Sequence, residues 1–278
     1  MKTIHPLEPD FDSPELVSCL DELSFWSAPF GMKILDLVRY GPSIHALDLA
    51  CGTRFPLIEL AMRLGPGSQV SGLDPWQVAL DRAKSKIGQY GPDNISLFHA
   101  EAENMPFFAD TFDLIVSNNG LNNVRNIEQA LSECYRVARP GAQFIWSMNT
   151  DDSFAPFYKL YRSVLRDHKL TGALSALEAH IYNKRPPVHE MKEKTESAGF
   201  RILDLHPASF SYRFSSGTAM FAHAFIRLAF MQAWLKIPPP EYRERVFSEL
   251  ESGLNKMAAE TGGLEMPIPF VVFECVKM

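Results

Sequence analysis

The chain has 278 residues, of which 46% are hydrophobic and 22% are charged, a composition that is too apolar for a disordered protein and typical of a globular one. Its formal net charge of −6 at pH 7 gives no positive field that would gather nucleic acid, so we expect no nucleic-acid partner. The four cysteines have neither zinc-ligand nor disulfide spacing, and we expect no metal site.

Residues 1–44 contain two segments, PELVSCLDEL and GMKILDLVRY, whose apolar residues recur at helical spacing. We interpret this region as an N-terminal helical lid. Its first sixteen residues include no apolar run that would act as a signal peptide, so we expect a cytoplasmic protein.

Residues 45–150 alternate short apolar strands with amphipathic helices, which is the pattern of βαβ units. Five strands are predicted, at 45–50, 69–74, 95–100, 112–119 and 143–149. Helices are predicted between them at 56–64, 76–90 and 127–137. Because such crossovers make a parallel sheet covered on both faces, the predicted fold class is α/β with a doubly wound, mostly parallel sheet.

The rest of the chain is predicted to complete this core and to add helices to it. Helices and loops at 150–198 complete a core at 45–210 and partly face the substrate. A helical insertion follows at 211–265, and 266–278 supplies the last strand of the core.

One segment of the insertion, residues 220–235, is very apolar, but His223, Arg227 and Gln232 interrupt it. A membrane-spanning helix needs about 18 uncharged residues, so we expect no stable membrane insertion. Two interpretations are open. The segment is either a helix buried nearly all round or a lid helix that meets an apolar substrate or a membrane surface.

Small residues and a carboxylate follow the first two predicted strands, at the edge where open parallel sheets bind ligands. Gly52, with Ala50 and Thr53 beside it, lets a cofactor approach the backbone closely. Asp74 follows Gly52 by 22 residues, a spacing at which a carboxylate accepts hydrogen bonds from both hydroxyls of a ribose. The residues after Gly52 are Thr-Arg-Phe-Pro and do not complete the GxGxxG pattern of dinucleotide-binding loops.

Four blocks resemble, in order and spacing, the class I S-adenosylmethionine-dependent methyltransferases: LDLACGTRFPLIELA, VSGLDP, HAEAENMPFFADTFDLIVSNNGL and ALSECYRVARPGAQFIW. The resemblance is close over 44–150 and looser over 189–210 and 269–278. Within the superfamily the chain is most similar to the small-molecule group that includes the quinone-biosynthesis C-methyltransferases. The resemblance implies a Rossmann-like methyltransferase fold with an antiparallel last strand, S-adenosylmethionine as cofactor, and a small, fairly apolar or aromatic acceptor.

The resemblance also implies a set of cofactor-binding residues: Asp48, Ala50, Cys51, Gly52, Thr53, Asp74, Trp76, Glu101, Ala102, Ser117 and Asn118. It assigns the loop at 48–53 to the methionine part and Asp74 to the ribose. Glu101 and the backbone of Ala102 are assigned to the adenine, and the pair at 117–118 to the sulfonium and the amino acid tail. Trp76 either covers a face of the adenine or packs between helix and sheet.

Arg54 departs from the family pattern, which has glycine at this position. Three interpretations are open: the side chain points outward, it pairs with a carboxylate of the cofactor, or it partly blocks the site. The alternative function is therefore a protein of the same fold that binds cofactor weakly or uses it without methyl transfer. A nicotinamide oxidoreductase is a further alternative. It is based only on the strand-loop-helix pattern around Gly52 and on the acid Asp74, which many nucleotide-binding proteins share.

The sequence gives weaker signals for the residues that bind the methyl acceptor. Methyl transfer is an in-line displacement that depends mainly on alignment, and a base is needed only when the acceptor must lose a proton. Weak candidates for that base are His180, Tyr182 and His189, and packing residues are the commoner outcome for them. Candidate acceptor-binding residues are Trp26 and Tyr212, from two aromatic clusters, and Asn122 and Asn123, from the run NNGLNN. The sequence indicates no oligomeric state.

Overall fold

The computed structural model describes residues 10–22, 26–53 and 55–278, and for residues 19, 20 and 22 it describes the backbone alone. Contacts within the described chain divide it into two compact units. The sheet unit contains Phe11–Asn149, Pro187–Ala208 and Phe270–Met278. The helical unit contains Asp10, Thr150–Pro186 and Ser209–Pro269.

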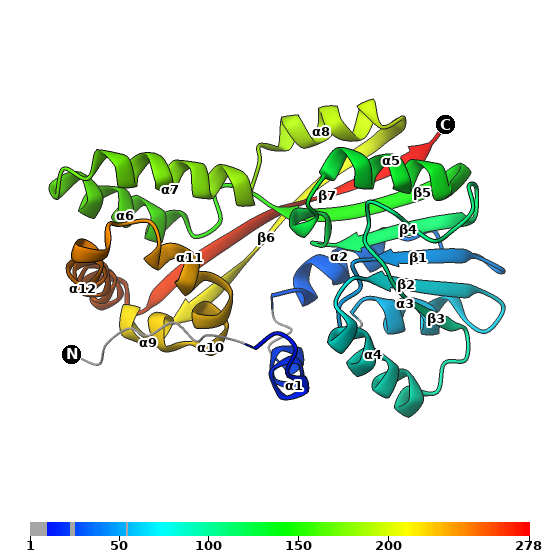
Figure 1. Cartoon of the computed structure of the whole chain (residues 1–278), viewed down its shortest axis with the longest axis horizontal. Coiled ribbons are helices and arrows are strands. Elements are labelled where there is room, and N and C mark those ends of the chain that lie inside the picture. The colour runs from blue at the N-terminus through cyan, green and yellow to red at the C-terminus, as the bar shows by residue number, and fades with distance from the viewer. Residues whose placement is uncertain (1–9, 23–25, 54) are drawn as a thin grey trace. The chain divides into compact units, whose positions relative to one another are not determined.

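The sheet has seven strands in the order β3-β2-β1-β4-β5-β7-β6 (Figure 1). Their bounds are β1 His45–Leu49, β2 Gln69–Asp74, β3 Ile95–His99, β4 Phe112–Asn118, β5 Ala138–Asn149, β6 Phe200–Phe214 and β7 Leu264–Lys277. The first five strands pair in parallel, and β7 pairs with β5 in the antiparallel sense. The predicted doubly wound sheet with an antiparallel last strand is confirmed.

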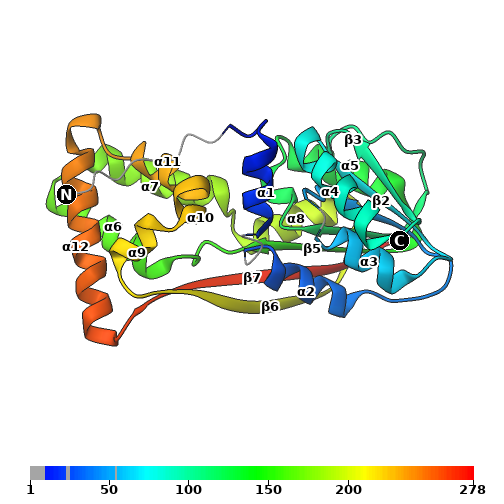
Figure 2. The same cartoon turned by 90° about the horizontal axis from the view of Figure 1, so that it is seen from below.

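The helices of the sheet unit are α1 Pro14–Glu22, α2 Ala28–Leu37, α3 Leu57–Leu64, α4 Gln77–Tyr90, α5 Ile127–Val137 and α8 Val188–Ser197. Figures 1 and 2 show α5 and α8 on one face of the sheet, with α2 and α3 on the other. Buried side chains from both faces form the core, including Trp146 and Phe273, whose rings stack with centroids 4.0 Å apart. Helix and strand patterns at these positions are strong because each element buries one apolar face.

The helices of the helical unit are α6 Ala155–Asp167, α7 Thr171–Lys184, α9 Gly217–Ala222, α10 Ala224–Ile226, α11 Gln232–Leu235 and α12 Arg243–Thr261, with a π-helical turn at Arg227–Met231. Its core is aromatic. The Trp234 ring lies 4.3 Å from the Phe157 ring, and the Tyr161 hydroxyl donates to the Trp234 carbonyl at 2.9 Å. Through these contacts, residues 150–186 pack with the insertion, whereas the predicted boundaries assigned them to the core.

The apolar segment 220–235 is not one helix buried nearly all round, and that interpretation is wrong. His223 has extended backbone dihedrals, with φ −65° and ψ 128°, so α9 ends there and the chain restarts as shorter pieces. Met231 and Trp234 are fully buried, but Ala224 and Ala229 are exposed. Within the described part of the chain, no helix has the length and apolar character needed to cross a membrane.

Candidate cofactor site

The parallel register brings the carboxyl ends of β1, β2 and β4 to one edge of the sheet. Leu49 in β1 lies opposite Leu73 in β2, and Asp48 lies opposite Val116 in β4. The strand order reverses at β1, which is the position where open α/β sheets bind ligands. Three predicted groups therefore meet at this edge: the loop at 50–53, Asp74, and the pair at 117–118.

The loop after β1 is held in an uncommon backbone conformation. Ala50 and Gly52 both adopt positive φ, 58° and 53°, and the Cys51 amide donates to the Leu73 carbonyl at 3.2 Å. A non-glycine residue in this region costs about 1–2 kcal/mol, so surrounding contacts must hold Ala50 there. One such contact is with Gly120, where an added Cβ would lie 2.5 Å from the Ala50 Cβ.

Asp74 fixes the same loop from the neighbouring strand. Its Oδ2 accepts a hydrogen bond from the Gly52 amide, and its Oδ1 accepts one from the Trp76 amide, each at 2.8 Å. Burial raises the pKa of Asp74, while these two amides and His99 act to lower it. Each carboxylate oxygen has a second lone pair, so Asp74 retains the capacity to accept bonds from a ligand hydroxyl.

Asp48 is a fully buried carboxylate at the end of β1. Neither of its oxygens has a hydrogen-bond partner among the residues that the structure describes. Burial raises the pKa of Asp48 well above its ordinary value, and the neighbouring Asp74 raises it further. The Leu57 backbone amide acts to lower this pKa, but it makes no close hydrogen bond to either oxygen. A carboxylate so buried is costly to ionise, so Asp48 favours a cationic or donating ligand close to it.

Ser117 and Asn118 end β4 beside this carboxylate. The buried Ser117 hydroxyl donates to the Leu49 carbonyl at 3.1 Å and links β4 to β1. The Asn118 side-chain amide donates to the Ser27 carbonyl at 3.1 Å and to the Phe55 carbonyl at 3.4 Å. Its Oδ1 is buried and has no partner within the described chain. The contact with Ser27 was not predicted, because it joins residues 91 positions apart.

The residues predicted for the adenine differ in how far they are exposed. Glu101 is exposed and forms an ion pair with Arg125 at 3.3 Å, whereas Ala102 is buried. Trp76 is half-buried, and its indole N–H donates to the Phe11 carbonyl at 2.7 Å while the two rings meet edge to face. The N-terminal segment is therefore one neighbour of Trp76. Arg54, on which the alternative function depends, lies outside the described residues.

The predicted acceptor residues occur in both units. In the sheet unit, Asn122 donates to the side-chain oxygens of Asn119 and Asn149, Asn123 is exposed, and the Trp26 ring lies 5.8 Å from the Phe30 ring. In the helical unit, Tyr212 lies on β6, nearly parallel to the Phe214 and Phe225 rings at 6.0 and 6.2 Å. Burial raises the pKa of Tyr212 to about 12.

The three weak base candidates are not brought together. His180 is half-buried in the helical unit, and burial, with Arg185 and Lys184 nearby, lowers its pKa to about 4. Tyr182 is 50% exposed on the same helix, and His189 is exposed on α8 of the sheet unit. All three therefore stay predictions.

The helical unit also contains a cavity of about 610 Å³, lined by residues that include Arg213, Thr261 and Glu265. None of the residues predicted for cofactor, acceptor or catalysis lines it. In the parts of the chain that the structure describes, no group of three or more His, Cys, Asp or Glu side chains is arranged to hold a metal ion.

Comparison with known proteins places this site in a family. A family model described as a methyltransferase domain matches residues 47–146. A demethylmenaquinone methyltransferase of Bacillus cytotoxicus is 31% identical over 189 residues, covering 64% of this chain and 78% of that protein. One of Lactobacillus johnsonii is 34% identical over 213 residues, covering 72% and 85%.

Solved structures agree on the fold. The crystal structure of a SAM-dependent methyltransferase from Aquifex aeolicus matches with a TM-score of 0.55 at 16% identity, covering 95% of this chain and 98% of that one. At this identity the likeness concerns the fold alone, and it confirms the Rossmann-like methyltransferase architecture. Together with the two relatives, it shows that the chain belongs to the class I S-adenosylmethionine-dependent methyltransferases, in the group similar to the quinone-biosynthesis enzymes, and that its cofactor is S-adenosylmethionine.

Proposed function

We propose that the protein transfers a methyl group to a small, fairly apolar or aromatic acceptor. The names of the two relatives refer to demethylmenaquinone, and a quinone of that kind belongs to this chemical class. The half-buried aromatic rings of Phe210, Tyr212, Phe214 and Phe225 are consistent with such an acceptor. The nicotinamide oxidoreductase alternative is not favoured, because the relatives are methyltransferases.

We further propose that the cofactor lies across the edge formed by β1, β2 and β4. Asp74 would accept hydrogen bonds from the ribose hydroxyls, and the loop at 50–53 would face the methionine part. The buried acceptors of Asp48 and Asn118 support this assignment, because a bound cofactor carries an ammonium group and a sulfonium that suit them. Glu101 and Ala102 would contact the adenine.

The bound cofactor supplies the methyl group, and the chain contributes alignment and the exclusion of water. A proton acceptor is needed only for an acceptor that loses a proton, and His180, Tyr182 and His189 stay weak candidates for that task. The chemistry therefore depends on how the acceptor is oriented. In the sheet unit, Asn122, Asn123 and Trp26 remain the residues proposed to orient it. Tyr212 remains a separate candidate in the helical unit.

The observation that carries this proposal is the buried Asp74 carboxylate at the end of β2, and it gives the direct test. The change Asp74→Ala should weaken the binding of S-adenosylhomocysteine by about tenfold or more, since hydrogen bonds to a charged group contribute about 1.5–3 kcal/mol. Titration calorimetry measures the affinity. The control is Asp81→Ala, an exposed acid on α4 that pairs with Gln77 and should leave the affinity unchanged. Equal affinities in all three proteins would overturn the proposed site.

The alternative based on Arg54 has its own test. If its side chain intrudes on the cofactor, Arg54→Gly should tighten the binding of S-adenosylhomocysteine. If the side chain points outward, the affinity should stay the same, and if it pairs with the cofactor carboxylate, the affinity should fall. A thermal-shift comparison with NAD and NADP checks the cofactor class, since a ligand at 100 times its Kd stabilises a protein by about 2.7 kcal/mol.

A further inference from the structure

The orientation of the Asn118 side-chain amide is fixed by two carbonyl groups. Its nitrogen donates to Ser27 in the segment that leads into α2 and to Phe55 in the loop after β1. Both amide hydrogens are therefore used, and the oxygen is left as a buried acceptor without a partner in the described chain. A flipped amide would place its oxygen against two carbonyl oxygens and lose both hydrogen bonds.

Gly31, within α2, sets how closely the helix approaches this amide. A Cβ at Gly31 would lie 2.2 Å from Cε1 of Phe55 and 2.9 Å from Nδ2 of Asn118, distances that side chains do not tolerate. A glycine inside a helix costs about 0.5–1 kcal/mol relative to alanine. That cost coincides here with a packing requirement, because a Cβ at this position would force the Phe55 ring and the Asn118 amide to shift.

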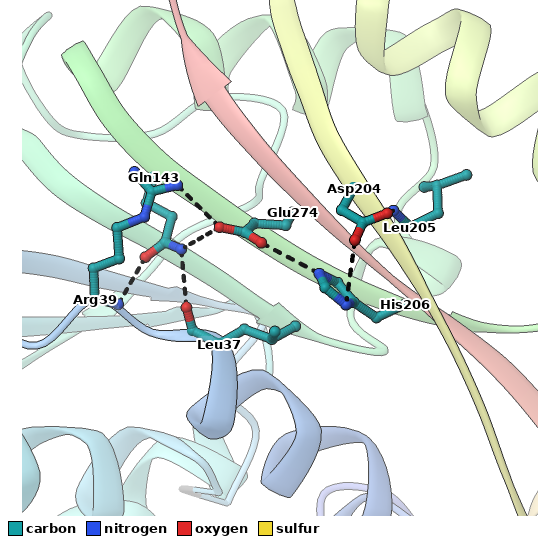
Figure 3. A network of polar contacts seen from close by, with 7 residues as sticks. All are labelled: Leu37, Arg39, Gln143, Asp204, Leu205, His206 and Glu274. Carbon is teal, nitrogen blue, oxygen red and sulfur yellow. Dashed lines mark hydrogen bonds and ion pairs between the residues drawn. The ribbon is translucent and has the colours of Figure 1, made fainter.

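α2 is itself anchored near both ends. Near its start, the Phe30 ring lies 4.6 Å from the Phe270 ring of β7. Beyond its last turn, Gln143 donates to the Leu37 carbonyl and accepts from the Arg39 amide, each at 3.0 Å. Figure 3 shows that this glutamine belongs to a network with Glu274 and His206. The helix is thus a fixed support for Asn118.

We propose that α2, through the Ser27 carbonyl and Gly31, positions Asn118 so that its oxygen faces the sulfonium of S-adenosylmethionine. This inference rests on the proposed cofactor site. A fixed oxygen dipole stabilises the positive sulfonium of the substrate and gives little to the neutral thioether of S-adenosylhomocysteine. The arrangement therefore favours the cofactor that still carries its methyl group and assists release of the product.

The ratio of the two affinities tests this role. Titration calorimetry of the full-length protein gives Kd for S-adenosylmethionine and for S-adenosylhomocysteine. We expect Gly31→Ala to lower the preference for S-adenosylmethionine by about threefold or more, because the added methyl group displaces the amide. General loosening would weaken both ligands equally and leave the ratio unchanged, and that result would overturn the inference. Gly88→Ala on α4, where a Cβ meets nothing within 4 Å, is the matched control and should preserve the ratio.

Two further variants keep the outcome interpretable. If Asn118→Ala changes neither affinity, the proposed cofactor site fails together with this inference. If Asn118→Ala lowers the ratio and Gly31→Ala does not, the inference fails and the site stands. Should Gly31→Ala not fold, as judged by circular dichroism, the double variant Gly31→Ala with Phe55→Ala removes the nearest clash. Its ratio should still be lowered, since the new Cβ remains close to Asn118, and an unchanged ratio in this variant would overturn the inference.

Discussion

The two units of the chain are built from different kinds of contact. In the sheet unit, the candidate cofactor edge is held by hydrogen bonds between loops and strand ends, such as those that the Gly52 and Trp76 amides donate to Asp74. In the helical unit, large rings pack on one another, with Trp234 against Phe157 at its centre. At the cofactor edge, hydrogen bonds fix the orientation of polar groups. At the centre of the helical unit, the packing of large apolar rings holds the helices together. The contrast can be tested by changing residues in each unit and measuring stability and cofactor affinity separately.

The largest effect is expected from Trp234→Ala in the helical unit. Trp234 is fully buried, and its indole N–H donates to the Tyr158 hydroxyl at 3.0 Å. Its loss should lower the free energy of unfolding by about 3–5 kcal/mol, as for other buried aromatic residues. The affinity of the folded protein for S-adenosylhomocysteine should stay near that of the wild type. Urea denaturation and calorimetry measure the two quantities, and a tenfold loss of affinity in folded protein would contradict the contrast.

A smaller effect on stability, with a clear effect on binding, is expected from Gly120→Ala in the sheet unit. The added Cβ would lie 2.5 Å from the Ala50 Cβ and 2.8 Å from the Ser117 hydroxyl. Such overpacking costs about 1–3 kcal/mol, and because it pushes on the loop after β1, S-adenosylhomocysteine should bind about tenfold more weakly. Gly67→Ala meets nothing within 4 Å and serves as the control. Unchanged affinity in Gly120→Ala would show that this loop does not form the site.

The network around Glu274 predicts a pH dependence. Burial acts to raise the pKa of Glu274, but hydrogen bonds from Arg39, His206 and Gln143 outweigh it, so the folded-state pKa is lowered. A lowered pKa gives stability that is present above the unfolded-state value of about 4.3 and is lost as the pH falls through the folded-state value.

Glu274→Gln should therefore reduce the free energy of unfolding at pH 7 by about 1 kcal/mol and flatten its decline in acid. Urea denaturation between pH 7 and about pH 3, which covers the range below the unfolded-state pKa, measures this. Glu193→Gln on α8, where the side chain is exposed, is the control. If both variants lose stability in parallel with the wild type as the pH falls, Glu274 is not the group responsible.

The smallest effect is expected at the surface of the sheet unit. Glu59 and Arg63 form an ion pair on α3 at 2.7 Å, with side chains 37% and 36% exposed. Exposed pairs of this kind contribute about 0.3–0.5 kcal/mol, so Glu59→Gln should shift the urea midpoint only slightly. A loss above 1 kcal/mol would show that surface charge, and not the internal polar contacts, stabilises this unit.

Much of the sheet could be predicted from the sequence, because its signals are local. Alternating strands and helices predicted β1 to β4 to within a residue or two, and the spacing of Gly52 and Asp74 brought them to one edge. A strand that buries both faces, such as β1, is mostly apolar, and a short pattern suffices to find it.

The remainder depends on contacts between distant residues, which no local pattern reports. Apolar composition at 220–235 predicted one helix, but it could not reveal the extended backbone at His223 that divides it. Tyr212 was assigned to a helical insertion, whereas β6 continues to Phe214. The close approach of Gly31 to Asn118 and Phe55 could not be predicted for the same reason. A glycine within a helical pattern does not indicate which distant residue packs against it.

The anchoring of α2 has a consequence for the order in which the chain folds. Arg39 and Glu274, which join at 3.0 Å, are separated by 235 positions, and Glu274 lies on β7. A folding chain forms local helices early, whereas contacts between residues so far apart in the sequence form late. The support that holds α2 should therefore be completed only after β7 has paired with the sheet.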